Sequence, residues 1–254
     1  MTRLADATWP EIAALAASGA VLVVPVGATE QHGPHLPITT DIDIAVAVVE
    51  AAGAHDPLLV TAPAVAFGSS GEHDGFAGTL SIGQEATEAV LVELGRSACA
   101  TFACVVFACS HGGNAAPLRR ALDRLSSENR PVFGWWPRWD GDLHAGRTET
   151  SVMLAIAPER VRMEEAAPGD IRPINELQTL LRSGGVRSVS ANGILGDPTG
   201  ASADEGRTLL DAAAADLVDA VARFRLQQQS TAQQSTGQQS TGRQSTGKRD
   251  GVRT

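Results

Sequence analysis

The sequence contains no tyrosine and a single lysine, Lys248, which lies close to its end. The absence of tyrosine excludes acid catalysis by a phenol. The absence of lysine elsewhere excludes a Schiff-base enzyme, a P-loop and a lysine general base in the folded part of the chain. Cysteine is also scarce. The three cysteines, Cys99, Cys104 and Cys109, lie in or near one apolar run, so we expect buried thiols and no disulfide.

Long apolar runs and an excess of basic residues are missing as well. No apolar run reaches the ~18 to 20 residues that a membrane span needs, and no early segment resembles a secretion signal. The chain carries 29 acidic and 20 basic side chains, with a net charge of −9. Because nucleic acids and anionic membranes bind cationic surfaces, we expect neither as a partner. The missing membrane span and secretion signal predict a cytoplasmic protein.

The motifs of several enzyme classes are also absent. The sequence has no G-x-G-x-x-G, no P-loop and no H-E-x-x-H, so dinucleotide-binding and zincin functions lack their main feature. The segment GSSG at residues 68–71 is similar to a nucleophile elbow, but Glu72 stands where the G-x-S-x-G motif needs glycine. A serine hydrolase is therefore disfavoured.

The sequence does contain a regular alternation of strand-like and helix-like segments. Continuously apolar runs such as VLVVPVG are typical of strands buried on both faces of a sheet. We expect strands near 21–27, 58–65, 103–109 and 131–136, and helices near 8–19, 41–53, 84–98, 115–127 and 149–157, followed by a closing helix. This order predicts βαβ units and an α/β fold with a mainly parallel sheet.

The chain divides by composition near residue 227. Residues 1–226 have the apolar content of one globular domain. Residues 227–254 consist of QSTG-like repeats that lack large apolar side chains. We therefore predict a single folded domain over 1–226 and a disordered tail over 227–254.

Polar clusters follow three of the expected strands. The first strand is followed by GATEQHGPHLPITTDID, the third by SHGGN and the fourth by WDGDLHAGRTETS. Loops at the carboxyl ends of parallel strands gather around one crevice, where ligands bind. We interpret Glu30 and His32 as alternate residues of a continuing strand, so that their side chains point to the same side.

These loops supply a candidate metal-binding set of two imidazoles and three carboxylates: Glu30, His32, Asp41, His111 and Glu149. Such a mixture suits one or two divalent ions such as Zn²⁺, Fe²⁺ or Mn²⁺. Any single member would equally serve as a helix cap or a solvated loop charge, but the three strand ends together supply all five. The glycines of HGGN predict either N–H donors exposed beside His111 or simply a tight turn.

The chain resembles the creatininase (creatinine amidohydrolase) family through VPVGATEQHGPHLPITTD, GEHDGFAGTLSIG, HGGN and HAGRTETS, which occur in that order and at the family's intervals. The match covers roughly residues 21–158, and its first and last motifs are highly specific. Within the family, GEHDGFAGTLSIG, HAGRTETSVMLAI and NGILGDPTGASADEG are most similar to the branch whose members trim a modified precursor peptide. That similarity extends to about residue 226.

The resemblance implies a three-layer α/β/α sandwich and a divalent-metal centre, often with two ions, that hydrolyses a non-standard or terminal amide. The family's metal ligands match Glu30, His32, Asp41 in the bridging place, and His111. Glu149 fits the remaining ligand, and His144 matches a histidine that shuttles protons, so His144 and Glu149 are our candidate catalytic residues. The chain departs from creatininase itself, which has a carboxylate where Gly113 stands.

We therefore predict a metal-dependent peptidase that releases the C-terminal Val-Tyr-derived fragment of a modified precursor peptide. We expect two ions per subunit, Fe²⁺ or Zn²⁺, with Mn²⁺ as an alternative. Two other functions stay open: an amidohydrolase of a small cyclic amide or a formamide, and a metal-binding scaffold that has lost catalysis. The resemblance also implies a homo-oligomer, because related members form hexamers.

Two further groups of residues have alternative interpretations. Glu72 and His73 lie just before the GFAG turn. They are interpreted as outer partners of the metal site, as substrate contacts or as part of a solvated loop. Trp135, Trp136 and Trp139 lie beside the His144 loop, where they would line an apolar pocket or else belong to the core or a subunit contact.

Overall fold

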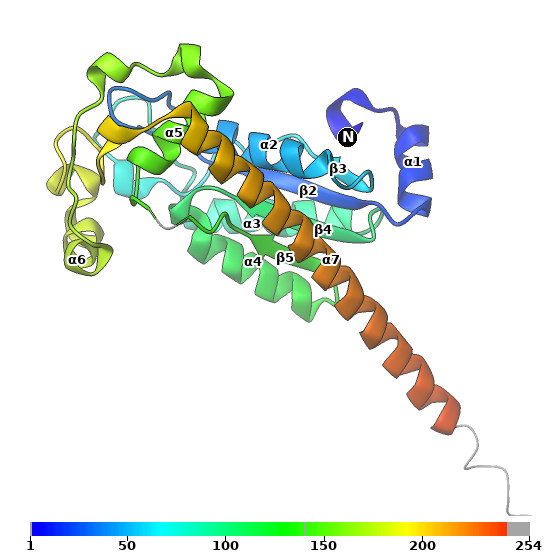
Figure 1. The fold of residues 1–254 in the computed structure, drawn as a ribbon. Coiled ribbons are helices and arrows are strands. Elements are labelled where there is room, and N and C mark those ends of the chain that lie inside the picture. The colour runs from blue at the N-terminus through cyan, green and yellow to red at the C-terminus, as the bar shows by residue number, and fades with distance from the viewer. Residues whose placement is uncertain (1, 140, 243–254) are drawn as a thin grey trace, which may run out of the picture. The chain divides into compact units, whose positions relative to one another are not determined.

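A computed structural model describes residues 2–139 and 141–242, and it divides the chain into two compact units, Met1–Val218 and Asp219–Thr254. The first unit contains the whole α/β fold (Figure 1). Within the described residues, no helix is long and apolar enough to cross a membrane.

The centre of the first unit is a five-stranded parallel sheet with the order β1-β3-β2-β4-β5. The strands are β1 (Thr2–Arg3), β2 (Val21–Val26), β3 (Leu59–Thr61), β4 (Cys104–Cys109) and β5 (Val132–Trp135). Every residue of the two central strands, β2 and β4, is buried, as continuous apolar runs predict. The strand β1 was not predicted, because two residues carry no periodic pattern.

Helices cover both faces of this sheet, with α2 and α5 on one side and α3 and α4 on the other (Figure 1). The helices are α1 (Trp9–Ala17), α2 (Thr40–Gly53), α3 (Gly83–Ala98), α4 (Ala115–Ser127), α5 (Arg147–Ile156), α6 (Ile174–Gly184) and α7 (Ala203–Gly242). Short 3₁₀ helices lie in the connections, at Leu4–Asp6, Gly71–His73, Gly112–Asn114, Pro158–Arg160, Met163–Glu165, Val186–Ser188 and Pro198–Gly200. The predicted three-layer α/β/α architecture is confirmed.

The core follows the layers of the sandwich. One cluster joins β2 and β4 to α3 and α4, with Phe107, Leu118 and Leu125 fully buried in it. A second cluster lies around α5 and includes Ile44 and Met153. All three cysteines are free thiols, as predicted. The two in β4 are buried, whereas Cys99 is only half-buried.

The closing helix differs from the prediction for the tail. Helix α7 continues past Leu226 through Gly242, whereas we predicted disorder from residue 227. Serine, threonine and glycine are weak helix formers, but adding residues to an existing helix is far easier than starting one, and the glutamines of the repeats favour the helix. Residues 243–254 lie outside the described residues. The domain boundary at 226 stays a prediction.

Candidate active site

The candidate site lies where the direction of the chain through the sheet reverses. From β2 the chain moves outward to β3, and it then returns to β4 on the other side of β2. The carboxyl ends of β2 and β4 therefore flank a crevice of the kind that binds ligands in open α/β sheets. Glu30 and His32 follow β2, and His111 follows β4, so the convergence of these loops is confirmed.

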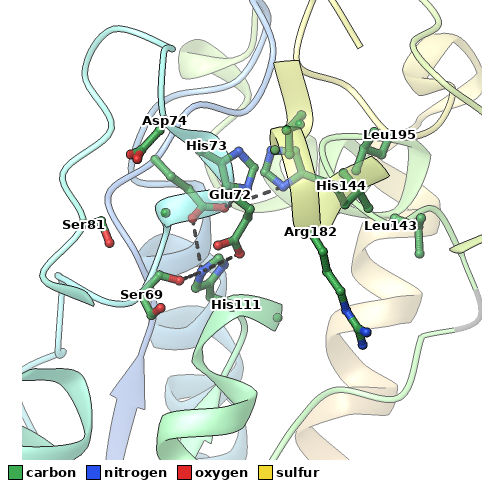
Figure 2. Close-up of a pocket in the computed structure, with 18 of the residues that line it drawn as sticks. Ser69, Glu72, His73, Asp74, Ser81, His111, Leu143, His144, Arg182 and Leu195 are labelled. Atoms are coloured by element: carbon green, nitrogen blue, oxygen red, sulfur yellow. Dashed lines mark hydrogen bonds and ion pairs between the residues drawn. The ribbon is translucent and has the colours of Figure 1, made fainter. Parts of the chain in front are cut away.

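Glu30 lies at the centre of a ring of histidines and is completely buried. Its Oε1 atom is 3.2 Å from His73 Nε2 and 3.7 Å from His144 Nδ1, and its Oε2 atom is 3.2 Å from His111 Nε2. Figure 2 shows His73, His111 and His144 together on the wall of the same pocket. One carboxylate thus faces imidazoles from three separate segments.

Asp41 occupies the first turn of α2 and joins the remaining candidates. Its Oδ1 atom is 3.3 Å from His32 Nε2, and its Oδ2 atom is 3.4 Å from His111 Nδ1. Glu149, in the first turn of α5, faces His32 from the other side at 3.8 Å. The structure therefore brings all five predicted metal ligands and His144 into one cluster.

Glu30 and His32 reach this cluster from a loop, and our prediction of a continuing strand was wrong. Strand β2 ends at Val26, four residues before Glu30. A strand would also point Gln31 to the opposite side from Glu30, yet Gln31 Nε2 lies 2.9 Å from His73 Nδ1 and 3.1 Å from His144 Nε2, and Glu30 faces the same two rings. The loop is compact enough to direct three successive side chains inward, which alternation along a strand does not allow.

Asn114 holds two of the converging loops in place. Its amide nitrogen donates to the carbonyl oxygen of Gly27 (2.9 Å), and its Oδ1 atom accepts from the amide nitrogen of Ser69 (2.9 Å). On the neighbouring strand end, Ser110 donates to the main-chain oxygen of Asp41 (2.7 Å). The HGGN segment therefore ties the ends of β2 and β4 together from the start of α4.

The electrostatics of the cluster are dominated by buried negative charge. Burial lowers the pKa of His32, but Asp41 beside it outweighs burial and raises that pKa to about 9. Burial likewise opposes protonation of His111, but Glu30 and Asp41 raise its pKa to about 10. Burial raises the pKa of Glu149 to about 7. The buried carboxylates therefore need positive charge nearby to balance them. Protons on His32 and His111 supply it here, and a bound cation would supply it equally.

The donor atoms fit a divalent metal. Both oxygens of Glu30, Oδ2 of Asp41 and Nε2 of His32 are buried without a hydrogen-bond partner among the described residues. Three overlapping groups have ligand atoms within 4.8 Å of one another: Glu30, Asp41 and His111; His32, His144 and Glu149; and Glu30, His73 and His144. Zn²⁺, Fe²⁺ or Mn²⁺ would satisfy the buried imidazole and carboxylate atoms that have no hydrogen bonds within the described part of the chain.

His144 is held in one orientation by the loop that follows β2. Its Nε2 atom lies 2.8 Å from the main-chain oxygen of Gln31, and because a carbonyl can only accept, Nε2 carries the proton. The Nδ1 atom then presents its lone pair toward Glu30. Burial, followed by the charges of His32 and His73, keeps the pKa of His144 well below its usual value. His144 is therefore a neutral imidazole with a free acceptor atom.

Other polar residues of these loops serve different purposes. His35 lies outside the cluster, with its Nε2 atom 2.9 Å from Thr150 Oγ1. Asp142 accepts from the amide nitrogen of Arg147 and so caps α5. Asp140, which belongs to the same polar segment after β5, lies outside the described residues. Sequence reasoning missed Gln31 altogether, although its place between two candidate ligands was a signal.

Gly113 and Glu72 share one place beside His111. A Cβ atom on residue 113 would collide with Glu72 Oε1, His111 Nε2 and the oxygen of Ser69. Glu72 Oε1 lies 3.7 Å from His111 Nε2, and burial raises the pKa of this carboxyl group. The absence of a side chain at Gly113 therefore leaves room for the carboxylate of Glu72.

A cavity of about 1020 Å³ opens onto the cluster, with Glu30, His73, His111 and His144 in its wall. Helix α6 contributes Ile174, Gln178 and Leu181 to the lining, one helical turn or two apart. No tryptophan is among its described lining residues. Trp135 instead donates to Asp216 (2.8 Å), and Trp136 and Trp139 pack against core clusters, so these side chains belong with the core.

Comparison with known proteins agrees with this architecture. A model of the creatininase family, described as creatinine amidohydrolase, matches residues 5–221. The "Mycofactocin precursor peptide peptidase" of Mycolicibacterium smegmatis is 49% identical over 212 residues, which are 81% of this chain and 85% of that protein.

Solved structures show the same fold. One titled "Crystal structure of creatinine amidohydrolase (creatininase)" superimposes with a TM-score of 0.73 at 23% identity and covers 87% of this chain and 97% of its own. A structure titled "Creatininase Mn" has a TM-score of 0.72 at 22% identity and covers 87% and 97% of the two chains.

The fold and the cluster of buried histidines and carboxylates define a hydrolase with an α/β/α sandwich. The chain belongs to the creatininase family.

Proposed function

We propose that this chain is a metal-dependent peptidase that cleaves the modified mycofactocin precursor peptide and releases its C-terminal Val-Tyr-derived fragment. The name of the Mycolicibacterium smegmatis relative supports this substrate. The observation that carries the proposal is the cavity of about 1020 Å³ over the His–carboxylate cluster. Pockets for drug-sized ligands span about 300–1,000 Å³, so this cavity fits a stretch of peptide better than a small cyclic amide.

We further propose that Glu30, His32, Asp41, His111 and Glu149 hold two divalent ions. Fe²⁺ and Zn²⁺ are the first candidates and Mn²⁺ the alternative, and the solved creatininase whose title names Mn supports a divalent ion in this fold. When bound, such ions polarise an amide carbonyl and make water a nucleophile near neutral pH. Asp41 would act together with both His32 and His111 in holding the ions, because its two oxygens face these two imidazoles.

His144 moves the proton in the proposed reaction. Hydrolysis joins the oxygen of water to the carbonyl carbon and breaks the bond from that carbon to nitrogen. The free Nδ1 atom of His144 accepts the proton that water loses and returns it to the leaving amine, so the imidazole ends the cycle neutral. Glu149 supports this step by accepting from the amide nitrogen of Ala145 (2.6 Å), which follows His144.

The proposed function is tested by mass spectrometry of the products. The chain, loaded with Fe²⁺ or Zn²⁺, is incubated with the enzymatically modified precursor peptide, and with creatinine and a formamide in parallel. We expect release of the modified C-terminal fragment, and its loss when a chelator is added. Consumption of a small amide alone would support the amidohydrolase alternative, and no turnover of any substrate would support the non-catalytic scaffold.

The role of His144 has its own test. We expect His144→Ala to retain its metal and to lose about 10²- to 10⁴-fold in kcat, the usual contribution of a positioned proton-transfer group. Metal content by mass spectrometry and kcat for the peptide are measured on the same preparation. Loss of metal from the variant would assign His144 to the ligands instead.

Assembly and location complete the proposal. We propose a homo-oligomer, a hexamer as in related family members, located in the cytoplasm. Light scattering of the purified chain would measure its mass in solution. A monomer at micromolar concentration would contradict the proposed assembly without affecting the proposed chemistry.

A further inference from the structure

Gln31 is a buried amide whose orientation is fixed by two main-chain groups. Its Oε1 atom accepts from the amide nitrogen of Gly33 (2.9 Å), and its Nε2 atom donates to the carbonyl oxygen of Gly193 (2.9 Å). An N–H can only donate and a C=O can only accept, so a flipped amide would lose both bonds. The chain approaches closely here: a Cβ on Gly193, whose φ is +81°, would collide with Gln31 Oε1.

The fixed amide determines where His73 carries its proton. Gln31 Nε2 lies 2.9 Å from His73 Nδ1, and because the amide nitrogen is a donor, Nδ1 must be the unprotonated atom. The proton of neutral His73 is then on Nε2, which lies 3.2 Å from Glu30 Oε1. His73 therefore presents an N–H group to Glu30.

The main chain of Gln31 sets the opposite state in His144. The carbonyl oxygen of Gln31 accepts from His144 Nε2 (2.8 Å), which leaves Nδ1 unprotonated and 3.7 Å from the same Oε1 atom of Glu30. The side-chain Nε2 atom of Gln31 also lies 3.1 Å from His144 Nε2, but its two hydrogens already go to Gly193 and His73. The two rings, whose centroids are 4.4 Å apart, thus face the same oxygen of Glu30 in opposite states. The His73 ring presents an N–H hydrogen to it, and the His144 ring presents a nitrogen lone pair.

We infer that Gln31 is a positioning residue that sets the tautomers of His73 and His144. His73 then directs its Nε2 hydrogen toward Glu30 Oε1 at 3.2 Å, and His144 keeps Nδ1 free to accept a proton. This inference rests on the proposed function only for the use that His144 makes of that free atom. The tautomers themselves are properties of the folded chain and are measurable without substrate.

Substitution of Gln31 by glutamate tests the inference directly. In Gln31→Glu, one carboxylate oxygen keeps the bond from Gly33, while the other can only accept, so His73 Nδ1 must carry a proton. In Gln31→Leu, of similar size, this position makes no hydrogen bond. Thr29→Val is the matched control, because it removes one hydrogen bond of the same loop, from Thr29 Oγ1 to the oxygen of Ala66 (2.8 Å), without touching a histidine.

The tautomers are measured by nitrogen NMR of the Zn²⁺-loaded chain labelled with ¹⁵N at histidine, with His73→Gln and His144→Gln used to assign the signals. We expect an unprotonated Nδ1 in both rings of the parent chain and in Thr29→Val. Gln31→Glu should move the His73 signal to a protonated Nδ1. An unchanged His73 tautomer in both Gln31 variants, or a protonated His144 Nδ1 in the parent chain, would overturn the inference.

Kinetics provide the second readout. Gln31→Glu and Gln31→Leu should lower kcat for the peptide at least 10-fold and leave KM within about twofold, and Thr29→Val should retain the kcat of the parent chain. An equal fall of kcat in the Thr29 control would indicate a general loosening of the loop and contradict a specific role for Gln31. If the parent chain turns over no peptide, the proposed function fails, while the NMR result still decides the tautomers.

Discussion

Among the residues of the cluster, Asp41 connects imidazoles that come from different strand ends. Its oxygens face His32 on the β2 loop and His111 after β4, and the side chain is buried. Removing its charge leaves both imidazoles without the carboxylate that they face, and it removes a proposed metal ligand.

We therefore expect Asp41→Asn to lose metal binding and turnover together. Outer partners of metal ligands alone contribute about 10- to 100-fold in affinity, so loss of a direct ligand should exceed roughly 100-fold. Metal bound after gel filtration is the measurement. Asp43→Asn is the control, because Asp43 lies on the same helix but pairs with Arg160 at 2.7 Å, outside the cluster. Equal metal loss in both variants would indicate a damaged helix.

Glu72 gives a second prediction at this scale. Its carboxylate lies on the pocket side of His111, in the space that Gly113 leaves free. Because it adds negative charge next to a proposed ligand, Glu72→Gln should weaken Zn²⁺ binding by about 10-fold. Asp74→Asn, which removes a carboxylate from the same loop, should bind Zn²⁺ as the parent chain does. Chelator competition measures the affinity of each protein for Zn²⁺. Equal affinities for the parent chain and both variants would show that Glu72 does not support metal binding.

At the scale of elements, the site depends on loops that are fastened at their ends. Asn114 is fully buried and bonds both to the Gly27 carbonyl after β2 and to the Ser69 amide. In Asn114→Ala these two main-chain groups lose their partners, at a cost of about 1–3 kcal/mol for an unsatisfied buried group. We expect a lower free energy of unfolding, measured with urea, together with weaker metal binding.

A variant of comparable stability separates the two effects of Asn114→Ala. Thr8→Ala removes the hydroxyl group of the residue that precedes α1, which donates to Glu11 (2.6 Å), at a cost of about 1 kcal/mol. Thr8→Ala should keep the metal affinity of the parent chain. If it weakens metal binding as much as Asn114→Ala does, then global stability, and not the tie between loops, controls the site.

The elements also show how far the sequence alone leads. Apolar runs predicted β2 and β4, and helical spacing predicted α4 with the same bounds, because burial in a layered sandwich requires these patterns. The loop from Gly27 to Thr39 was not predictable in this way. Its course depends on contacts with distant residues, such as Gln31 with Gly193, and a local pattern contains no information about such partners. The residues of the site could be predicted because three strand ends converge, but their orientation could not.

For the whole molecule, the proposed metal binding would be coupled to folding, because the proposed ligands come from segments as far apart as Glu30 and Glu149 and meet only in the folded chain. A ligand at 100 times its Kd stabilises a protein by about 2.7 kcal/mol. For a domain of this size, we expect Zn²⁺ at that excess to raise Tm by about 5–10 °C.

The same coupling tests the predicted domain boundary. Every proposed ligand lies in the unit Met1–Val218, so a chain that ends at Leu226 should show the same rise in Tm with Zn²⁺ and the same kcat as the full chain. Asp41→Asn, in either length, should show almost no rise. If the shortened chain folds but loses the response to Zn²⁺, then residues 227–254 contribute to the metal centre, and the domain extends beyond Leu226.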